Sequence, residues 1–474
     1  MTSRSLRNLP SQSRLISQKW SPCTSRSTVK CQATSKQNKV TTKGGSVQVP
    51  EENYVIVNFS YKTWRPTLQI SGATKDCRKR ERMFGGCVRR ENESLKVGRY
   101  GISAEDLQAE VVNWCLQYLA LKKCPTHLLW VIVNRASQKR NAFLEGDLFT
   151  NGIYDSAKVT QLLISTVQEI VKSLLDGDKQ TLNCSAEVVD SPTTSECSER
   201  NRRRTNEDRF VVIPDLMSTY ELKHPHPLGF YAVFDGHGGT FAASYSAVHL
   251  PYFLASNLAA GENCLTAISN AFNTTDSAFS KKCEDVKVRG GTTAVCALYD
   301  AKQSQLHVGW AGDSKALLVK EGQLTQIVRP HIPTDPKESQ RITEQGGSIM
   351  YWGGVMRVNG ALAVSRSIGD VPHKPFISSE PDIETVVLNG KEDFVVLSSD
   401  GLWDVVSEEA IANEIYSTLR DNCEEVGNIA RKLVNTAKNL GASDNITVVV
   451  IFLKDPQRIA EQVRSGLIPL LDCS

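Results

Sequence analysis

Uninterrupted apolar runs that end near a glycine or an acidic residue recur along the chain from about residue 200 onward. The run at 230–234 reads FYAVF and leads directly into DGHGG at 235–239. A continuous apolar and aromatic run that includes a β-branched valine predicts a buried strand. Similar β-prone runs predict further strands at 209–213, 306–310, 393–399 and 446–453.

A second pattern, with apolar residues three or four positions apart, predicts helices. It is clearest after Asp155, where Val159 and Leu163 begin a series that continues to Leu174, and Gly177 can end the helix. This spacing places the apolar side chains on one face of a helix. Further helices are predicted at 103–123, 265–280, 407–419 and 456–463.

These patterns divide the chain into four parts. Residues 1–50 are basic and rich in serine and threonine, which predicts disorder, and residues 51–180 predict a smaller, mainly helical accessory domain. Residues 181–455 alternate strands with helices, which indicates an α+β sandwich of two sheets covered by helices. Residues 456–474 form a short tail. The polar stretch at 178–200 is expected to be a linker or a loop leading into the sandwich.

The composition narrows the classes of function. Of the 474 residues, 40% are hydrophobic and the net charge is only +3, so the chain has no global signal for nucleic-acid or membrane binding. The longest apolar run, near 127–133, is too short to span a bilayer. Thirteen cysteines without a Cys-x-x-Cys pair indicate reduced thiols inside a cell. Residues 1–50 contain nine Lys or Arg and no acid, so an organelle transit peptide is an alternative to simple disorder.

Acidic residues gather at the predicted turns and strand ends. They are Glu207, Asp208, Asp235, Asp313, Asp370, Asp400, Asp404 and Asp444. Carboxylates that are brought together repel one another, so several can share a site only if cations neutralise them. Oxygen ligands without a His or Cys cluster predict magnesium, manganese or calcium. The spacing alone does not show that these residues converge, and a turn explains any single Asp-Gly equally well.

A metal site of this kind suits the hydrolysis of phosphate esters. Two divalent ions activate a shared water for in-line attack on phosphorus, and an arginine stabilises the charge that develops. Three arginines at 202–204 precede Glu207, and His237 follows Asp235 by two positions, where it can protonate the leaving oxygen. A solvated basic loop is the alternative interpretation of the arginines.

A cysteine nucleophile is the rival chemistry. The spacing Cys-x5-Arg occurs at 197–203 and at 283–289. The intervening residues are bulky and partly acidic, whereas a phosphate cradle needs small residues whose backbone N–H groups point inward. We therefore interpret both matches as coincidence.

Seven segments, in order along the chain, resemble the motifs of a known family, the metal-dependent protein serine/threonine phosphatases of type 2C. They read RRTNEDRF (203–210), VFDGHGG (233–239), GGTTA (290–294), GWAGDSKA (309–316), RVNGALAVSRSIGD (357–370), SSDGLWDVV (398–406) and GASDNITVVVIFL (441–453). The resemblance implies a four-layer αββα sandwich with a dinuclear magnesium or manganese site at one end. It also implies hydrolysis of phosphoserine and phosphothreonine by direct attack of a hydroxide that bridges the two ions.

The resemblance further implies the ligands of the two metal ions. Glu207, Asp235 and the carbonyl of Gly236 match the ligands of one ion. Asp235, Asp400 and Asp444 match those of the other, so Asp235 is expected to bridge them.

The remaining site residues are also implied by the resemblance alone. Asp313 and Asp404 match the acidic ligands of a weaker third metal ion. Asp208 matches the residue that holds a metal-bound water, Arg203 the phosphate-binding arginine and His237 the general acid.

Within the family, the text VRPHIPTDPKESQRITEQGG (328–347) is similar to the calmodulin-dependent protein kinase phosphatases and their nematode sex-determination relative. Most members of the wider family have Asp-His-Lys-Pro where this chain has Pro-His-Ile-Pro at 330–333, and the subgroup shares the proline before the histidine. The subgroup implies phosphoprotein substrates, with a protein kinase among them, and a partner that binds the N-terminal domain. It also implies the cytoplasm, and the acid-free N-terminus leaves mitochondria as the alternative.

Two other classes of function compete with the enzyme. A catalytically inactive scaffold or adaptor on the same fold is disfavoured because every expected ligand position still holds its acid. Nucleic-acid binding lacks a recognisable motif and is not expected. The physiological substrate and the oligomeric state do not follow from these residues.

Overall fold

The structure is a computed structural model of the chain. It describes residues 101–122, 124, 126–139, 148–150, 152–175, 191–286 and 289–470. All of these residues belong to one compact unit. The predicted disorder at 1–50 lies outside the described residues, as does the boundary expected between 180 and 181, which stays a prediction.

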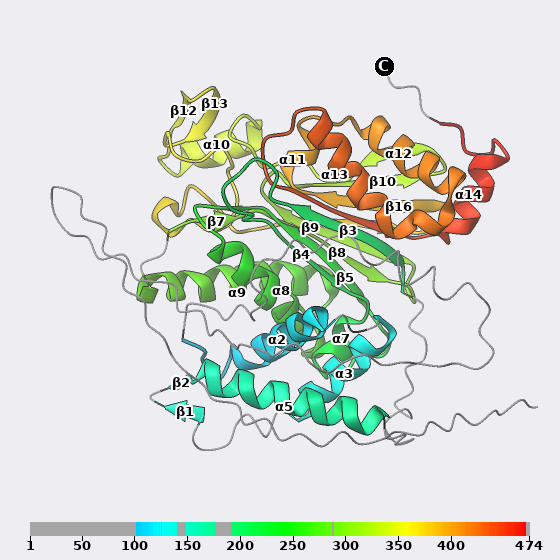
Figure 1. The fold of residues 1–474 in the computed structure, drawn as a ribbon. Helices are drawn as coiled ribbons and strands as arrows, with labels where there is room; N and C mark the ends of the chain where they lie inside the picture. The colour runs from blue at the N-terminus through cyan, green and yellow to red at the C-terminus, as the bar shows by residue number, and fades with distance from the viewer. Residues whose placement is uncertain are drawn as a thin grey trace, which may run out of the picture. The chain divides into compact units, whose positions relative to one another are not determined.

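Two five-stranded antiparallel sheets form the centre of the described structure (Figure 1). The first has the order β11 (Gln323–Gln326), β10 (Lys315–Lys320), β16 (Glu392–Ser398), β17 (Ile446–Phe452) and β3 (Thr193–Glu199). The second has the order β15 (Asp382–Val387), β9 (Gln305–Ala311), β8 (Ala294–Asp300), β5 (Gly229–Phe234) and β4 (Arg209–Ile213). The strands predicted at 209–213, 230–234, 306–310, 393–399 and 446–453 are thus confirmed, within one or two residues at their ends.

Burial on both faces explains why the central strands have uninterrupted apolar sequences. In β5, Tyr231 and Val233 pack in the cluster between the two sheets. Phe230 and Phe234 point the other way, into a cluster with the covering helices. Because side chains alternate across a strand, a strand that is buried on both sides needs apolar residues at every position.

Helices cover the outer face of each sheet and complete the four layers (Figure 1). One layer contains α8 (Phe241–Ala259) and α9 (Cys264–Val286), and the other contains α12 (Glu408–Asp421), α13 (Ile429–Asn439) and α14 (Pro456–Arg464). The α+β, four-layer αββα fold expected from the sequence is therefore confirmed, as are the helices at 265–280, 407–419 and 456–463. The side chain of Ser407 caps α12 by accepting a hydrogen bond from the Ala410 N–H.

The linker predicted at 178–200 is wrong at its C-terminal end, because Thr193–Glu199 forms the edge strand β3. This strand pairs with β17 along its whole length. Its sequence, TTSECSE, is too polar to predict a strand. An edge position tolerates that polarity, and the tertiary pairing overrides the local propensity. The few inward side chains still find partners, since Ser195 Oγ accepts a hydrogen bond from the Ala430 N–H at 3.0 Å.

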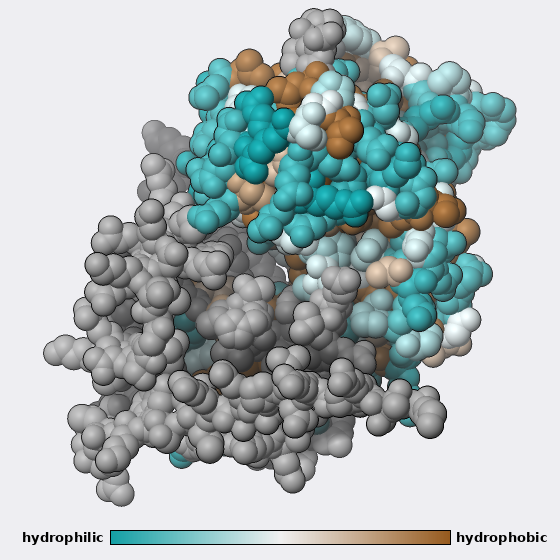
Figure 2. Space-filling view, turned by 90° about the vertical axis from the view of Figure 1, so that its right-hand side faces the viewer, coloured by the Kyte–Doolittle hydropathy of each residue, from teal (hydrophilic) through white to brown (hydrophobic). Residues whose placement is uncertain are grey.

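The shorter elements join these layers or project from them. They are α7 (Leu216–Thr219), β6 (Gly236–His237), β7 (Gly291–Thr292), α10 (Pro336–Glu344), β12 (Ile349–Trp352), β13 (Val355–Val358), β14 (Ile368–Gly369), η2 (Val371–His373), α11 (Asp400–Trp403) and η3 (Cys423–Asn428). The β12–β13 hairpin exposes Tyr351 and Trp352, which are 70% and 69% accessible. The face in Figure 2, which is the right-hand side of Figure 1, is mostly hydrophilic over its coloured part.

The expected helical region precedes the sandwich. It contains α2 (Leu107–Leu121), α3 (Thr126–Gln138), the small hairpin β1 (Phe149–Thr150) and β2 (Ile153–Tyr154), and α5 (Ser156–Leu175). Trp114 of α2 and Leu163 of α5 belong to the same buried cluster as Leu250 of α8 and Phe230 of β5. The helical region therefore shares one hydrophobic core with a sheet of the sandwich.

A buried ion pair reinforces this contact. Lys282 of α9 donates to Asp106 Oδ2 at 2.7 Å and to the carbonyl oxygen of Gly101 at 2.7 Å. The Asp106 side chain is 5% exposed. None of the described helices is long and apolar enough to cross a membrane.

The shared core predicts the effect of truncating Trp114, which is fully buried. Trp114→Ala should lower the free energy of unfolding by about 3–5 kcal/mol, because it opens a cavity in the core that the helical region shares with the sandwich. Chemical denaturation followed by circular dichroism should show one transition that shifts as a whole. The exposed Leu121 of the same helix provides the control, since Leu121→Ala should change little. Two transitions, of which only the first moves, would contradict the shared core.

Candidate active site

A small three-stranded sheet at the end of β5 assembles the site. Its order is β14, β7, β6, so β7 lies between the DGHGG turn and the segment that leads to Asp370. His237 pairs with Gly291, and Gly291 pairs in turn with Gly369. This register brings His237 against Asp370, with Nε2 of the histidine 2.7 Å from the carboxylate Oδ2.

The predicted carboxylates converge around Asp235, which follows β5 directly. Burial raises the pKa of Asp235 well above its usual value, and the charges of Asp208, Asp400, Asp313 and Asp444 raise it further. The carboxylates lie close enough to oppose one another's ionisation, and each lies within two residues of the end of a strand in one of the two central sheets.

Two of these neighbours show the same effect. Burial raises the pKa of Asp400 to about 7, with further contributions from Asp313, Asp404 and Asp444. Burial also raises the pKa of Asp208 to about 6, although a hydrogen bond from Ser399 Oγ to Oδ2, at 2.8 Å, works in the opposite direction.

The two acids expected at a third metal position also lie near each other. Burial raises the pKa of Asp313, and the charge of Asp404 adds to the effect. Burial likewise raises the pKa of Asp404, against the opposing charge of Lys315. Asp313 lies two residues after the end of β9 at Ala311, and Asp404 directly follows α11.

Glu207 reaches the same turn from the opposite side. Its Oε2 accepts a hydrogen bond from the Gly239 N–H at 3.1 Å, and its own N–H donates to Asn445 Oδ1 at 2.8 Å. A Cβ atom at Gly236 would lie 2.5 Å from the backbone oxygen of Glu207. Only glycine allows this close approach, which fits the expectation that the backbone at Gly236 faces a ligand.

Arg203 lies at the mouth of the acidic site. Its Nη2 forms an ion pair with Asp444, and 57% of its side chain is exposed. The guanidinium is therefore accessible to a phosphate group and is held beside the carboxylates by one of them.

Asp370 has a part in the site that the sequence does not indicate. The sequence places it among the acids at predicted turns without giving it a role. In the structure its carboxylate faces His237 and also accepts a hydrogen bond from Ser367 Oγ at 2.5 Å. Burial opposes ionisation of both groups, yet their hydrogen bond and opposite charges raise the pKa of His237 and lower that of Asp370. The backbone of Asp370 has a left-handed φ of 51°, so the position is held by its surroundings.

The residues fit a hard divalent cation. All the converging side chains offer oxygen donors. Asp208 is buried, and its Oδ1 accepts no hydrogen bond from the described residues. A buried anionic oxygen without a partner is costly unless a cation or an ordered water satisfies it.

Among the described residues, no group of three or more His, Cys, Asp or Glu side chains stands in metal-binding geometry. A cation bound between the carboxylates would offset their mutual repulsion.

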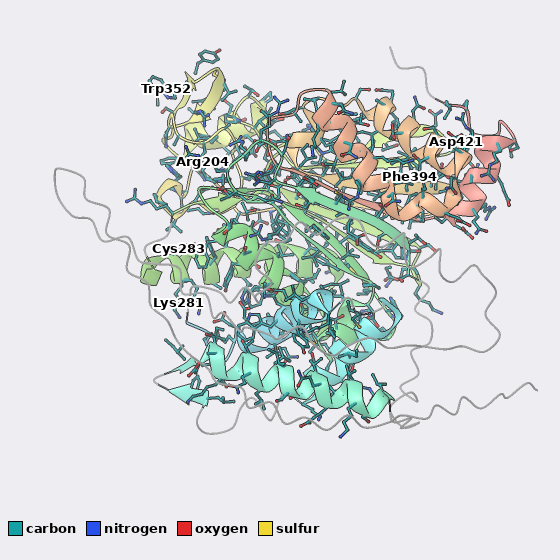
Figure 3. The ribbon with its side chains drawn as sticks, in the orientation of Figure 1. Arg204, Lys281, Cys283, Trp352, Phe394 and Asp421 are labelled. Atoms are coloured by element: carbon teal, nitrogen blue, oxygen red, sulfur yellow. The ribbon has the colours of Figure 1, made fainter. Side chains whose placement is uncertain are left out.

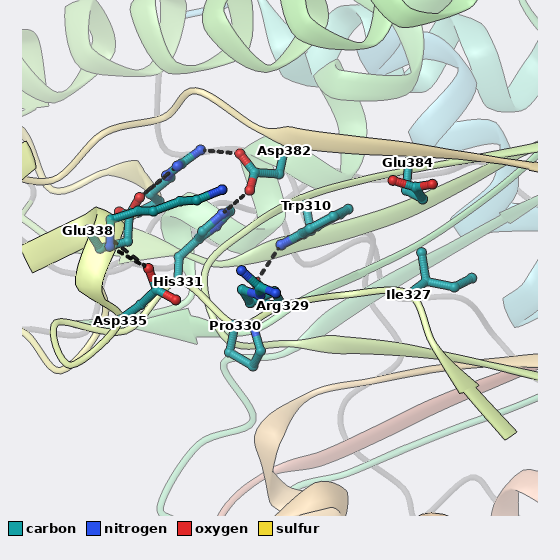
Figure 4. A pocket seen from close by; sticks show the side chains of 11 residues that line it. Trp310, Ile327, Arg329, Pro330, His331, Asp335, Glu338, Asp382 and Glu384 are labelled. Atoms are coloured by element: carbon teal, nitrogen blue, oxygen red, sulfur yellow. Dashed lines mark hydrogen bonds and ion pairs between the residues drawn. The ribbon is translucent and has the colours of Figure 1, made fainter.

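A separate polar pocket of about 240 Å³ lies between β9, β15 and α10 (Figure 4). His331, from the Pro-His-Ile-Pro segment, accepts a hydrogen bond from the Gly312 N–H on Nδ1 at 3.2 Å, and its Nε2 lies 3.2 Å from Asp382 (Figure 4). Because Gly312 precedes Asp313, this histidine fixes the loop that carries one of the acids. A residue that lines the pocket thus helps to hold the loop of Asp313 in place.

Both cysteines of the rival Cys-x5-Arg spacing are buried within secondary structure. Cys197 lies in β3 and Cys283 lies in α9. Burial raises the pKa of Cys283 to about 11, which disfavours the thiolate that a nucleophile requires.

Comparison with known proteins now adds to this geometry. Residues 193–446 match the family model described as Protein phosphatase 2C. The chain belongs to the protein phosphatase 2C family. The match covers more than half of the chain and contains every expected site residue.

Individual phosphatases agree with the family match. The chain is 36% identical to mouse Protein phosphatase 1E over 365 residues, which is 75% of this chain and 48% of the relative. It is 32% identical to mouse Protein phosphatase 1F over 378 residues, which is 76% of this chain and 82% of the relative. The chain thus spans about half the length of Protein phosphatase 1E.

A solved structure extends the likeness to the helical region. The structure of a C. elegans sex determining protein aligns with a TM-score of 0.67 and 26% identity, over 76% of this chain and 91% of that one. The subgroup expected from the sequence, the calmodulin-dependent protein kinase phosphatases with their nematode relative, is confirmed by these matches. The family match agrees with the family expected from the sequence.

Because the buried carboxylates repel one another, removing one charge by Asp235→Asn is expected to raise the stability of the metal-free protein. In chelator, the variant should be more stable than the wild type by about 2 kcal/mol, because one buried charge is removed from among its neighbours. The carboxylate pKa values are raised in the folded state, so the folded wild type binds more protons than the unfolded chain. In chelator it should therefore lose stability as the pH rises from about 4, the usual pKa of an aspartate, to about 7, the raised value of Asp400.

Manganese should reverse the order of the two proteins, because only the wild type keeps all its ligands and gains stability by binding the ion. Melting curves with and without manganese measure both effects, and Asp421→Asn, on the exposed end of α12, is the control. A lower melting temperature of Asp235→Asn in chelator would show that the carboxylates do not repel one another.

Proposed function

We propose that this chain hydrolyses phosphoserine and phosphothreonine in proteins with the help of two magnesium or manganese ions. The observation that carries the proposal is the convergence of buried carboxylates around Asp235 beside Arg203 and the His237–Asp370 pair. Carboxylates that destabilise the fold by their mutual repulsion are expected where a cation and a phosphate are bound.

We assign the ligands by combining the family resemblance with this geometry. Glu207, Asp235 and the carbonyl of Gly236 would hold one ion, and Asp235, Asp400 and Asp444 the other. Asp313 and Asp404 would hold a weaker third ion. Bound there, the ions would supply an activated water for direct attack on phosphorus and would neutralise the phosphoryl charge. Asp208, with a buried oxygen that has no partner among the described residues, would orient that water.

His237 would act on the other side of the phosphorus. Its Nε2 faces Asp370, so Nδ1 is the ring nitrogen left to give a proton to the leaving oxygen of serine or threonine. The bond between phosphorus and this oxygen breaks as the water oxygen bonds to phosphorus. An alkoxide is a poor leaving group, so protonation matters more for serine and threonine than for an aryl ester.

Arg203 would bind the equatorial phosphate oxygens. Its ion pair with Asp444 is exposed and holds the guanidinium at the site mouth. Exposed pairs of this kind contribute about 0.2–1 kcal/mol, so a phosphate dianion can compete for the guanidinium.

Three finer proposals rest on the subgroup resemblance alone. A protein kinase is among the substrates, residues 51–180 bind a partner protein, and the chain acts in the cytoplasm, with mitochondria as the alternative. An inactive scaffold remains the second candidate function. The complete set of acids at the expected positions disfavours it.

Phosphate release from a phosphothreonine peptide by the full chain tests the proposal. Release is expected with manganese or magnesium and not with chelator. Asp400→Asn should lower kcat at least about 100-fold, because it removes an expected ligand, and Asp421→Asn should leave kcat unchanged. A folded chain that releases no phosphate with either metal would favour the scaffold.

The His237–Asp370 pair predicts a dependence on the leaving group. Asp370→Asn keeps a residue that tolerates the left-handed backbone but removes the charge that stabilises the histidinium. We expect kcat for phosphothreonine peptide to fall about 10- to 100-fold and kcat for an aryl phosphate to fall much less. His237→Gln should show the same selectivity, and the double variant should be no worse than either single one. Equal losses on both substrates would exclude this role for Asp370.

A further inference from the structure

The loop between β3 and β4 is held firmly against the acidic site. Asn201 Nδ2 donates to the carbonyl oxygens of Ala442 and Asp444 at 2.6 and 2.9 Å. Asn445 Nδ2 donates back to the carbonyl oxygens of Arg200 and Thr205 at 2.9 and 3.0 Å. The loop is therefore fastened at both ends to the turn that carries Asp444, and its backbone has little freedom.

A further contact fixes the middle of the loop from within. Arg200 Nη1 donates to the carbonyl oxygens of Arg203 and Arg204 at 2.7 and 3.2 Å. The guanidinium group of Arg200 is therefore occupied by hydrogen bonds within the loop. The three arginines that follow Asn201 all have exposed side chains.

The guanidinium groups of two of those three arginines do not stabilise the described fold through a hydrogen bond or an ion pair. Arg203 pairs with Asp444, whereas the guanidinium groups of Arg202 and Arg204 contact no hydrogen-bond or ion-pair partner in the described part of the chain. Figure 3 shows Arg204 on the same side of the ribbon as Trp352 and Cys283. Arg202 and Arg204 are the chain neighbours of Arg203, the residue expected to bind phosphate, and the backbone that carries them is held by hydrogen bonds.

The charges around Arg202 and Arg204 indicate which class of ligand these residues bind. The site beside them contains many carboxylates, which repel an acidic peptide even when the ions compensate part of their charge. Two guanidinium groups at the rim offset that repulsion locally. Guanidinium binds carboxylate and phosphate in a planar, two-pronged geometry.

The spacing also suits an extended peptide. Arg202 and Arg204 are each one residue from Arg203, so their Cα atoms lie at most about 7 Å apart. Side chains two positions apart on an extended peptide are separated by a similar distance. Arginine side chains are long, so a peptide whose phosphate contacts Arg203 brings acidic side chains one or two positions away within reach of both of its neighbours.

We propose that Arg202 and Arg204 form a binding site for acidic side chains, including a second phosphorylated residue, that flank the phosphorylated serine or threonine. This inference rests on the proposed phosphatase function and adds the class of substrate to it. The enzyme would favour phosphorylation sites in acidic sequences.

The test compares phosphothreonine peptides that differ only at the two residues on each side of the phosphothreonine, which are Glu, Gln or Lys. The measure is the ratio of kcat/KM between the Glu and Gln peptides, because a change in the acidic site itself affects both peptides alike. Each exposed ion pair alters affinity by about 1.4- to fivefold, so two pairs should give a ratio of about 2 to 25 at low salt. The ratio should approach one in about 0.5 M salt, where the screening length is only about 4 Å.

Charge reversal provides the decisive variant. Arg202→Glu with Arg204→Glu should invert the preference toward the Lys peptide, whereas Arg202→Lys with Arg204→Lys should keep most of the preference for Glu. Arg458→Glu, at an exposed position of α14, is the matched control and should leave the ratio unchanged. Melting temperatures of all variants should match the wild type, because the two side chains have no partner among the described residues.

The outcomes of this test distinguish a failure of the inference from a failure of the proposed phosphatase function. Hydrolysis of all three peptides with equal kcat/KM, or a ratio that the Arg202→Glu and Arg204→Glu changes do not alter, would overturn the inference and leave the phosphatase intact. No hydrolysis of any peptide with manganese or magnesium would count against the phosphatase itself.

Discussion

Electrostatic repulsion among the buried carboxylates around Asp235 is the constraint on which the rest of the site depends. A lone buried carboxylate would simply take up a proton, but here burial and four other acids act on Asp235 together. The surrounding polar contacts hold these acids in place. Ser399 holds Asp208, Asn445 holds the backbone of Glu207, and Gly236 lets two chain segments approach closely. The hydrophobic layers behind them provide the stability that offsets this repulsion.

The parts of the fold and of the site that could be predicted from the sequence are those marked by a pattern in a short stretch of residues. The apolar run at 230–234 and its DGHGG turn identify β5 and the position of Asp235, and the Ser407 cap marks the start of α12. The polar β3 has no such signal, because pairing with β17 alone makes it a strand. The contact between His237 and Asp370, 133 residues apart, depends on the register of three short strands that no sequence pattern specifies. The family resemblance supplies the ligand assignments, which spacing alone leaves open.

The shared core changes how the helical region should be regarded. The sequence predicts an accessory domain, but Trp114 and Leu163 pack in the same cluster as the helices over β5. α8 begins at Phe241, only two residues after the Gly239 that ends the DGHGG turn. A partner that altered the packing of α2 on α8 would therefore act on an element attached directly to the site. The Asp106–Lys282 pair places charge at the same contact, and its burial makes separation of the two surfaces costly.

The exposed hairpin of β12 and β13 gives the molecule an optical probe. Trp352 is 69% accessible, whereas Trp114 is fully buried. An indole in water emits at longer wavelength than one in an apolar interior, and only the former is reached by a dissolved quencher such as acrylamide. The chain contains seven tryptophans, so in a variant that keeps only Trp114 and Trp352 the two residues report on separate events in one sample. A change at the hairpin alters the quenchable, red-shifted emission, and a loosening of the helical region alters the protected, blue-shifted emission.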